Sequence, residues 1–397
     1  MRLKQKELID YYLGGFLIAI LKPVFLAAGK LLGIDHSPLP KGDIVIMKLL
    51  GGGSLILALP ALLGIRKRFS GRSIHLVTTP AILPFAETLS LFDQIHIIDD
   101  SGGALKLISS ALKTIRSIFL IDTFIDLEIH SRLSTIFSGL SAARNRIGFY
   151  LRDVFWRKDI QSHLVFFNPA ANVYYEYKAC AEIIGASPAS FQESRDHLRK
   201  SLSAVSLAGE LPEGYMVMGH TCSDLSLERM LSPRQWKTAL KRLIKENIIS
   251  RDIPVVFLGT ARDFDKAEAI TREIGNHLKN PFINLCGKYR LIESIKIISG
   301  ARYFAGIDSS LLHYARILGI PSTSYWGPTN PNTLMTPAAK DYQEEVFYER
   351  IPCSPCVHIT DTPPCNGKAF CIESLFKEDH QEKEFTLIYN PDTSAGL

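Results

Sequence analysis

The richest set of reactive side chains lies where the sequence reads GIDSSLLH. Asp308, Ser309 and Ser310 stand between an expected strand and an expected helix, and His313 follows one turn into that helix. Free backbone N–H groups and the helix dipole at such a junction form an anion site suited to phosphate. Asp308 can hold the loop or accept from a ligand hydroxyl, and His313 can face the same ligand. The plain alternative is a serine that caps the helix, followed by a buried histidine.

Two further strand-to-helix turns in the same half of the chain carry polar side chains. The first, GHTCSDLSLER, offers Thr221, Ser223 and Arg229. Arg229 is suited to pairing with a diphosphate, although a lone arginine is usually a solvated surface residue. The second turn, LGTARDF, places Asp263 near a helix start, where a carboxylate either caps the helix or binds a sugar hydroxyl.

Four of the seven cysteines fall within one short stretch, in the pattern C-x2-C-x8-C-x5-C. They are Cys353, Cys356, Cys365 and Cys371, and His358 lies nearby as a spare ligand. Paired C-x2-C motifs are typical of zinc sites, but only the first pair here has that form. The spacing leaves three alternatives: a structural metal such as zinc, reduced buried thiols, or disulfides, which a cytoplasmic location disfavours.

Strands and helices alternate over most of the chain and must position these side chains. In the first half, strands are expected over 42–50, 73–79, 94–100, 118–126, 146–151 and 162–168, and helices over 55–69 and 105–117. In the second half, strands are expected over 215–221, 254–260, 282–287, 301–310 and 321–327, and helices over 232–247, 263–278, 290–299 and 311–318. Ser232 and Pro233 are favoured residues for a helix start. This alternation predicts an α/β protein with parallel sheets, arranged as two Rossmann-like domains that face a cleft.

The domain boundaries follow from composition, and a length of 397 residues fits two domains. Residues 191–212 are polar and poor in aromatic side chains, which predicts a linker. The linker separates an N-terminal domain over 41–190 from a C-terminal domain over 213–345. Residues 346–397 form a cysteine-rich segment and tail, and residues 1–40 an apolar N-terminal helix.

The overall composition excludes several classes of protein. A hydrophobic content of 46% with 21% charged residues excludes a disordered, fibrous or polytopic membrane protein. A net charge of +5 without a dense basic run argues against nucleic-acid binding.

The apolar N-terminal segment has an uncharged run, Tyr11–Leu21, that is shorter than the ~20 residues needed to cross a bilayer. No cleavage site of a secretory signal follows it. Lys22 and Lys30 interrupt the segment and favour a helix in the membrane interface. The alternative is a helix packed on the protein's own surface.

Taken in order, several segments resemble glycosyltransferase family 9, which contains the lipopolysaccharide heptosyltransferases and has the GT-B fold. The similar segments are KLLGGGSLILALPAL, AARNRIGF, LSPRQW, VVFLGTARDFDKAEAI and NLCGKYRLIESIKIISGARYFAGIDSSLLHYARILGIPSTSYWGPTNP. The resemblance covers most of the chain, residues 42–375. It implies inverting, metal-independent transfer of a sugar, heptose or a related one, from a nucleotide-diphosphate donor to a lipid-linked or lipopolysaccharide-type glycan. No cofactor is then required for catalysis. The protein is expected in the cytoplasm, peripheral on the inner face of the membrane.

The resemblance also implies a donor site in the second domain. Backbone N–H groups, hydroxyls and one fixed cation are able to stabilise a leaving diphosphate without a metal ion. The cysteine-rich segment becomes a peripheral element of the same domain. The donor-binding positions are Thr221, Ser223, Arg229, Asp263, Asp308, Ser309, Ser310 and His313.

The sequence departs from the family at the expected general base. Relatives carry Gly-Asp in the first loop, whereas this chain has Ser54 after Gly51, Gly52 and Gly53. Serine cannot remove a proton at neutral pH unless another base assists it. The glycines suit close backbone approach to an acceptor, or a plain turn.

The best substitute bases are Asp126 and Glu128. If the segment stays extended, alternation places both on one face, with His130 next along it. The alternative is a salt bridge from these carboxylates to Arg132 or Arg144.

Two other functions remain open from the sequence. Because the usual base is Ser54, the chain can be a catalytically silent relative that binds a sugar nucleotide or a partner. A sugar-nucleotide epimerase uses the same architecture.

Overall fold

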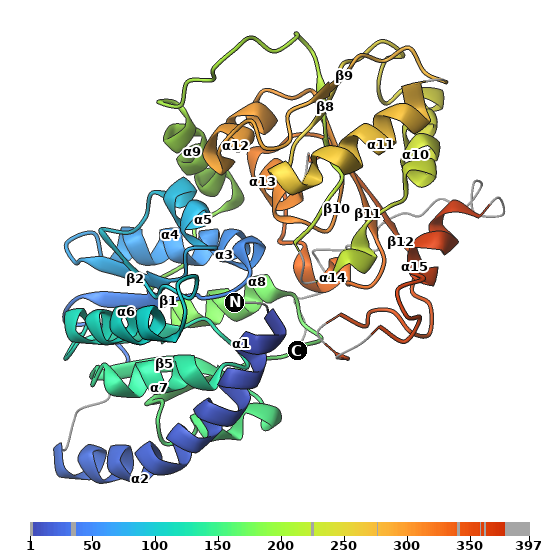
Figure 1. The fold of residues 1–397 in the computed structure, drawn as a ribbon. Coiled ribbons are helices and arrows are strands. Elements are labelled where there is room, and N and C mark those ends of the chain that lie inside the picture. The colour runs from blue at the N-terminus through green and yellow to red at the C-terminus, as the bar shows by residue number, and fades with distance from the viewer. Residues whose placement is uncertain are drawn as a thin grey trace, which may run out of the picture. The chain divides into compact units, whose positions relative to one another are not determined.

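The computed structural model describes residues 3–32, 37–223, 226–275, 277–339, 342–357, 359–360 and 363–377. The chain divides into two compact units, Met1–Ser190 and Phe191–Leu397. Each unit is built around a parallel sheet with helices on both faces (Figure 1).

The sheet of the first unit has the strand order β3-β2-β1-β4-β5-β6. Its strands are β1 (Ile44–Met47), β2 (Ile74–Thr78), β3 (Gln94–Ile97), β4 (Thr123–Asp126), β5 (Asn145–Tyr150) and β6 (His163–Phe166). All six predicted strands of this half are thereby confirmed. In this doubly wound order, β1 and β4 are the central neighbours, and the loops that follow them leave the same edge of the sheet at the switch point.

The helices of the first unit include three that the sequence analysis does not anticipate, α5, α7 and α8. The helices that connect or follow the strands are α3 (Gly52–Leu57), α4 (Leu59–Arg68), α5 (Leu83–Leu89), α6 (Ala104–Ser117), α7 (Arg132–Leu140) and α8 (Val173–Glu182), with a short 3₁₀ segment, η2 (Arg152–Arg157). Short helices of this kind are stabilised mainly by tertiary packing, which sequence periodicity does not report.

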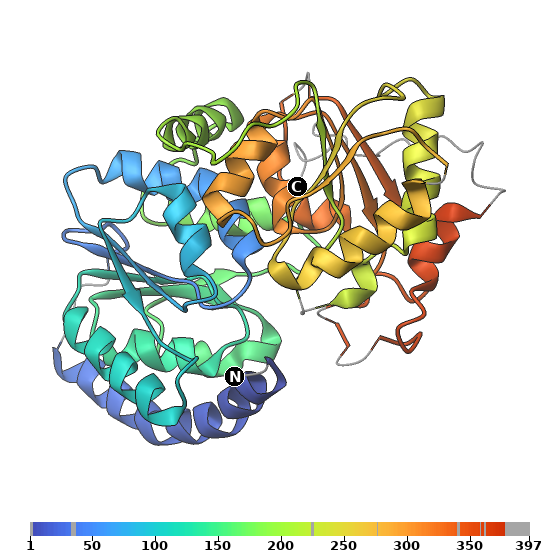
Figure 2. The ribbon, with the colours of Figure 1, turned by 45° about the horizontal axis from the view of Figure 1, so that its top comes forward.

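The N-terminal segment is one long helical rod made of α1 (Leu3–Ile9), a π-helical turn η1 (Asp10–Gly14) and α2 (Gly15–Leu32). By length and composition, Gln5–Ala27 is long and apolar enough to cross a membrane, although its uncharged run, Tyr11–Leu21, is shorter than a bilayer needs. One side of the rod packs on α7 and η2, where Ile18 joins Ile136 and Trp156 in a small apolar cluster. The rod runs along the first unit in Figure 2.

The start of α7 is capped by a residue far away in the sequence. The carboxylate of Asp10 accepts hydrogen bonds from the backbone N–H groups of Arg132 and Leu133, both at 2.8 Å. The guanidinium of Arg132 in turn lies over the rings of Tyr11 and Trp156, at 4.6 and 4.0 Å from their centroids. These contacts fix the rod to α7 through polar as well as apolar groups.

The second unit repeats the topology of the first, with the order β12-β11-β10-β7-β8-β9. Its strands are β7 (Met216–Gly219), β8 (Val255–Phe257), β9 (Phe282–Asn284), β10 (Tyr303–Ile307), β11 (Ser322–Trp326) and β12 (Glu344–Tyr348). Because β7 and β10 occupy the places that β1 and β4 hold in the first sheet, the loops after β7 and β10 form the second switch point.

The helices of the second unit agree with the sequence analysis in most places. They are α9 (Phe191–Leu202), α10 (Pro233–Lys245), α11 (Phe264–Gly275), α12 (Leu291–Ser299), α13 (Ser310–Leu318), α14 (Pro331–Leu334) and α15 (Phe370–Glu373), with 3₁₀ turns η3 (Leu227–Arg229), η4 (Ala261–Asp263) and η5 (Ser374–Phe376). The predicted helix start at Ser232 and Pro233 is confirmed, since Ser232 and Gln235 form a reciprocal capping box.

Two expectations about boundaries are corrected. The predicted linker over 191–212 contains α9, which packs on α12 and α13 with Leu198 and Leu202 buried. Its polar composition reflects an amphipathic helix that needs few apolar residues. The boundary at 345 divides β12, which pairs in parallel with β11.

The segment that follows β12 belongs to the second unit rather than to an appendage. Cys371 and Ile372 of α15 are part of its apolar core, and the ring of Phe376 stacks on Tyr325 at a centroid distance of 5.6 Å.

Candidate active site

The loop after β10 leaves two buried polar atoms without partners. Ser309 directly precedes α13 in the N-cap position, but its side chain makes no capping hydrogen bond. Among the described residues, neither Ser309 Oγ nor His313 Nδ1 has a hydrogen-bond partner, and both are shielded from solvent. Such atoms are costly unless a ligand or water satisfies them. The plain alternative for Ser309, a capping serine, is therefore not what the structure has.

Arg229 lies against the same loop. Its Nη1 donates to the Asp308 carbonyl oxygen at 3.0 Å and lies 3.3 Å from Asp308 Oδ2. Its Nη2 donates to Ser223 Oγ at 3.3 Å. Asp308 thus holds a largely buried arginine in place, and Ser223 belongs to the same hydrogen-bonded group. Arg229 is not the solvated residue that a lone arginine usually is.

Thr221 and Ser310 frame this group on separate loops. Thr221 is buried in the turn after β7, and Ser310 is the half-buried first residue of α13. Since β7 and β10 are paired neighbours, both residues follow adjacent strands at one edge of the sheet.

Asp263 has a capping role. Its Oδ2 accepts hydrogen bonds from the backbone N–H and the hydroxyl of Thr260, at 2.9 and 2.8 Å, and Lys266 lies 3.3 Å from Oδ1. Burial acts to raise the pKa of Asp263, but the Thr260 hydrogen bonds and Lys266 outweigh it, and the pKa is lowered. The carboxylate is therefore ionised and already occupied by protein groups, which favours the capping alternative.

His313 is neutral in the folded protein, and its pH dependence is testable. Burial lowers its pKa from 6.5 to about 4. Between these values the unfolded chain binds a proton that the folded chain does not, so stability rises with pH through this window. His313→Gln should remove about 3 kcal/mol of that rise, measured by urea unfolding from pH 4 to pH 7. The exposed His277→Gln is the matched control. Equal slopes in wild type and His313→Gln would contradict the prediction.

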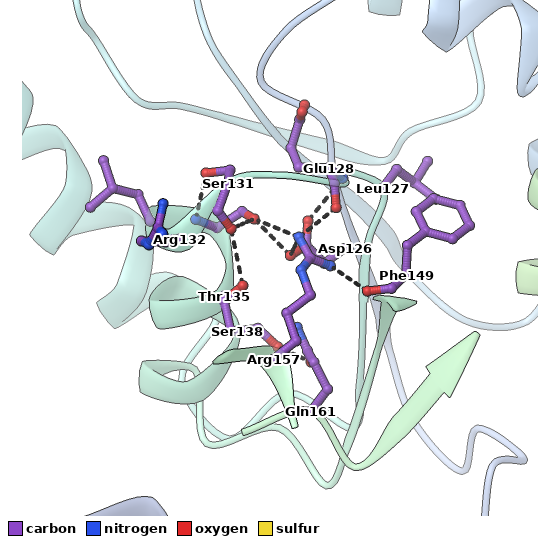
Figure 3. A network of polar contacts seen from close by, with 12 residues as sticks. Asp126, Leu127, Glu128, Ser131, Arg132, Thr135, Ser138, Phe149, Arg157 and Gln161 are labelled. Carbon is purple, nitrogen blue, oxygen red and sulfur yellow. Dashed lines mark hydrogen bonds and ion pairs between the residues drawn. The ribbon is translucent and has the colours of Figure 1, made fainter. Parts of the chain in front are cut away.

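In the first unit, Asp126 and Glu128 do not share a face. β4 ends at Asp126, and the backbone N–H of Glu128 donates to Asp126 Oδ1 at 3.0 Å. The chain therefore turns where the sequence analysis allows it to remain extended. Figure 3 shows the Glu128 side chain directed away from Arg157.

Asp126 is committed to a buried ion pair. Its Oδ2 lies 3.0 Å from Nη2 of Arg157 and accepts from Ser134 Oγ at 2.7 Å, with both charged side chains fully buried (Figure 3). Arg157 lies on η2, so the partner is neither Arg132 nor Arg144, the two arginines that the sequence analysis considers. Arg144 pairs with Asp122 instead. A carboxylate without solvent access is unsuited to accept a proton from an external hydroxyl.

Glu128 holds the loop after β1 with one oxygen. Its Oε1 accepts from the backbone N–H groups of Leu49 and Leu50, at 2.7 and 3.0 Å, and from Lys48 Nζ at 3.2 Å. Burial acts to lower the pKa of Lys48, but the Glu128 carboxylate raises it overall. Every hydrogen bond that the Glu128 side chain receives within the described part of the chain goes to Oε1, so Oε2 remains for a ligand.

The glycines in the loop after β1 are explained by local structure. Gly51 has a φ of +76°, which favours glycine, and a Cβ on Gly52 would lie 2.3 Å from the Phe85 ring. The backbone conformation thus explains Gly51, and packing against Phe85 explains Gly52. Ser54 lies in the first turn of α3 with Gly52 and Gly53.

Among the described residues, the cysteine-rich segment shows no group of ligands for a metal, which is one of the three alternatives that its spacing leaves open. All four of its thiols are free, and no three His, Cys, Asp or Glu side chains among the described residues are grouped to hold a metal. His358 lies outside the described residues. Cys356 and Cys371 are buried, and burial raises the pKa of Cys371 to about 12. The alternative of reduced buried thiols accounts for Cys356 and Cys371, whereas Cys353 and Cys365 are only partly buried, and the structural metal stays a prediction.

Lys48 and Arg157 are the charged residues that the sequence analysis misses. Arg157 follows an apolar pair in VFWR, and Lys48 stands inside an apolar strand region. The one signal in the sequence is a single basic residue among apolar ones. Because a buried charge is rarely left uncompensated, such a residue indicates an acidic partner elsewhere in the chain.

Two doubly wound units of the same strand order define a GT-B glycosyltransferase fold. Residues 130–366, more than half of the chain, match the model of glycosyltransferase family 9, described as heptosyltransferase. The chain belongs to that family.

Its similarity to individual relatives is more limited. It is 29% identical over 130 residues to the lipopolysaccharide heptosyltransferase 1 of Pseudomonas aeruginosa, over 32% of this chain and 34% of that protein. It is 28% identical over 108 residues to the lipooligosaccharide heptosyltransferase 2 of Haemophilus influenzae, over 27% and 31%. The matched stretches cover about a third of these relatives. The ADP-heptose lipopolysaccharide heptosyltransferase II of E. coli has the same fold, with a TM-score of 0.57 and 17% identity over 84% of this chain and 98% of that one.

Proposed function

We propose that the protein is an inverting, metal-independent glycosyltransferase that moves heptose or a related sugar from an ADP-linked donor to a lipid-linked or lipopolysaccharide-type glycan. Family membership supports the class of reaction. The observation that carries the donor site is the pair of buried, unpartnered atoms at Ser309 and His313, beside the fixed guanidinium of Arg229. The choice of ADP follows the similar E. coli enzyme, which is named for ADP-heptose.

The second unit is assigned to the donor. The backbone N–H groups at the start of α13 are oriented to bind a diphosphate, and its dipole favours negative charge. Arg229, held by Asp308, supplies a guanidinium, and Thr221 and Ser223 supply hydroxyls. As the bond from the anomeric carbon to the diphosphate breaks, charge grows on the leaving ADP, and these donors stabilise it without a metal ion.

The first unit is assigned to the acceptor. Glu128 Oε2 takes the proton from an acceptor hydroxyl, whose oxygen attacks the anomeric carbon opposite the leaving diphosphate. The product has the inverted configuration, and ADP leaves with the electrons of the broken bond. Ser54 cannot supply this base, and Asp126 is withheld by its buried pair with Arg157.

Binding of ADP tests the donor site. At about 100 times its dissociation constant, ADP should stabilise the second unit by about 2.7 kcal/mol, seen as a rise in melting temperature. Arg229→Met should abolish most of the rise, whereas Arg251→Met, an exposed arginine of the same unit, should keep it. If ADP leaves the wild-type melting temperature unchanged, the donor assignment is wrong.

An assay of sugar transfer distinguishes the proposed glycosyltransferase from a catalytically silent relative and from an epimerase. Transfer of sugar in the presence of EDTA supports the metal-independent mechanism. A catalytically silent relative, which the Ser54 substitution favours, would bind ADP yet transfer sugar to no acceptor. Conversion of the donor sugar without any acceptor would indicate an epimerase.

We also propose that the N-terminal rod lies in the interface of the cytoplasmic membrane, on its inner face. Its side away from α7 exposes Tyr12, Phe16, Ile20 and Val24 at four-residue spacing. The opposite side is anchored on the first unit through Ile18 and Asp10. A rod held along one side is able to place its apolar face in a lipid surface but would have to leave α7 to cross the bilayer.

A further inference from the structure

A second apolar surface of the first unit lies on α6. Leu105, Ile108 and Leu112 are exposed by 85%, 54% and 62%, and their spacing places them on one side of the helix. On the opposite side of α6, Leu107 packs against the apolar cluster on the sheet and Thr114 is buried. Phe119 and Leu120, directly after the helix, are also exposed. α6 therefore presents apolar side chains that its own unit does not cover.

The charged side chains of α6 itself are all basic. The chain has no Asp or Glu from residue 101 to residue 120. Lys106, Lys113 and Arg116 are exposed on α6, and only Lys106 forms an ion pair, with Asp99 at 2.8 Å, within the described part of the chain. An apolar row flanked by basic side chains matches an anionic lipid surface. Two copies of this face would bring like charges together, which disfavours self-association.

α6 and the N-terminal rod lie on the same side of the first unit. Leu107 of α6 and Phe137 of α7 pack into one cluster on the sheet, and the rod packs on α7 (Figures 1 and 2). Lys6 of α1 forms an ion pair with Asp100, just before α6. The N-terminal end of the rod therefore lies near the start of α6.

We propose that α6 is a second membrane-docking element, which binds the surface of an anionic bilayer through Leu105, Ile108 and Leu112 with Lys113 and Arg116. The proposal deepens the proposed function, on which it rests for the lipid-linked acceptor. Unlike the rod, α6 is an integral crossover helix of the sheet. Docking through it would hold the first unit in a fixed orientation on the membrane.

Vesicle co-sedimentation of the full chain tests this proposal. The vesicles are phosphatidylcholine with or without phosphatidylglycerol. The triple variant Leu105→Ser/Ile108→Ser/Leu112→Ser and the variant Lys113→Glu/Arg116→Glu should each reduce binding to the anionic vesicles by about tenfold or more. Phe166→Ser, an exposed aromatic on the edge strand β6, is the matched control and should bind as wild type. Unchanged melting temperatures verify that the variants are folded.

Three results would overturn the proposal. The first is that both α6 variants bind anionic vesicles as tightly as wild type, so that the rod alone accounts for docking. The second is that the wild type does not bind anionic vesicles. The third is that light scattering shows a dimer that the triple variant dissociates, while vesicle binding is unaffected.

An assay of transfer to a detergent-dispersed acceptor separates this proposal from the proposed function. Loss of vesicle binding with retained transfer supports docking through α6. A wild type that transfers no sugar, yet binds vesicles through α6, would remove the proposed function and leave the docking surface.

Discussion

Glu128→Gln should lower kcat for sugar transfer by about 10²- to 10⁴-fold, the usual contribution of a general base. Affinity for ADP should change little, because the residues assigned to the donor lie in the second unit. Glutamine keeps the shape of the side chain and an oxygen that accepts from Leu49 and Leu50. The measurement is steady-state kinetics alongside ADP binding by calorimetry.

The control for this variant concerns Lys48, which would lose its charged partner while remaining buried. Lys48→Met/Glu128→Gln removes both charges and should recover stability but not turnover. Ser54→Asp introduces the carboxylate that relatives carry, and it should restore part of the transfer in the Glu128→Gln background. A Glu128→Gln enzyme with wild-type kcat would eliminate Glu128 as the base.

Arg157→Met should destabilise the first unit by about 3–5 kcal/mol, the typical cost of removing one partner from a buried ion pair. The loss arises because the fully buried Asp126 would lose its cationic partner. Burial already raises the pKa of Asp126, so the carboxyl would have to take up a proton or remain an uncompensated charge. Urea unfolding, followed by a probe in the first unit, measures the change. ADP should bind the variant with unaltered affinity.

Two further variants test the cause of this loss. Asp126→Leu/Arg157→Met removes both charges and should be closer to wild type than Arg157→Met. Lys178→Met breaks the exposed pair with Glu182 on α8 and should cost about 1 kcal/mol or less. Equal losses for Lys178→Met and Arg157→Met would show that burial of the pair is not the cause of the loss.

The fold was predictable where its strands are buried on both faces. Parallel strands covered by helices appear as continuous apolar runs, and β1 and β2 are of this kind, with every residue buried. The helix at Ser232 and Pro233 was predictable for a local reason, since its capping box lies within four residues. α7 has local signals that the sequence analysis does not use, since RLSTIFSGL carries apolar residues at helical spacing and Ser131 caps its start. Its additional cap from Asp10 is a tertiary contact that no local pattern encodes.

The candidate site was predictable in its location but not in its partners. Switch-point loops follow from the alternation of elements, and the sequence analysis therefore selects Asp308, Arg229 and Glu128. Tertiary contacts decide which of these side chains are already bound by protein groups. Asp126 pairs with an arginine 31 positions away, and Glu128 binds backbone groups of a different strand's loop. No local pattern encodes either contact.

The capping of α7 by Asp10 has a practical consequence for anyone who produces this protein. Removing an apolar N-terminal helix is a common way to improve solubility, and here it would have the opposite effect. A shortened chain would expose Ile136 and Trp156 and leave the amide groups at the start of α7 without their carboxylate. Preparations should retain the helix and use mild detergent to shield its outer face.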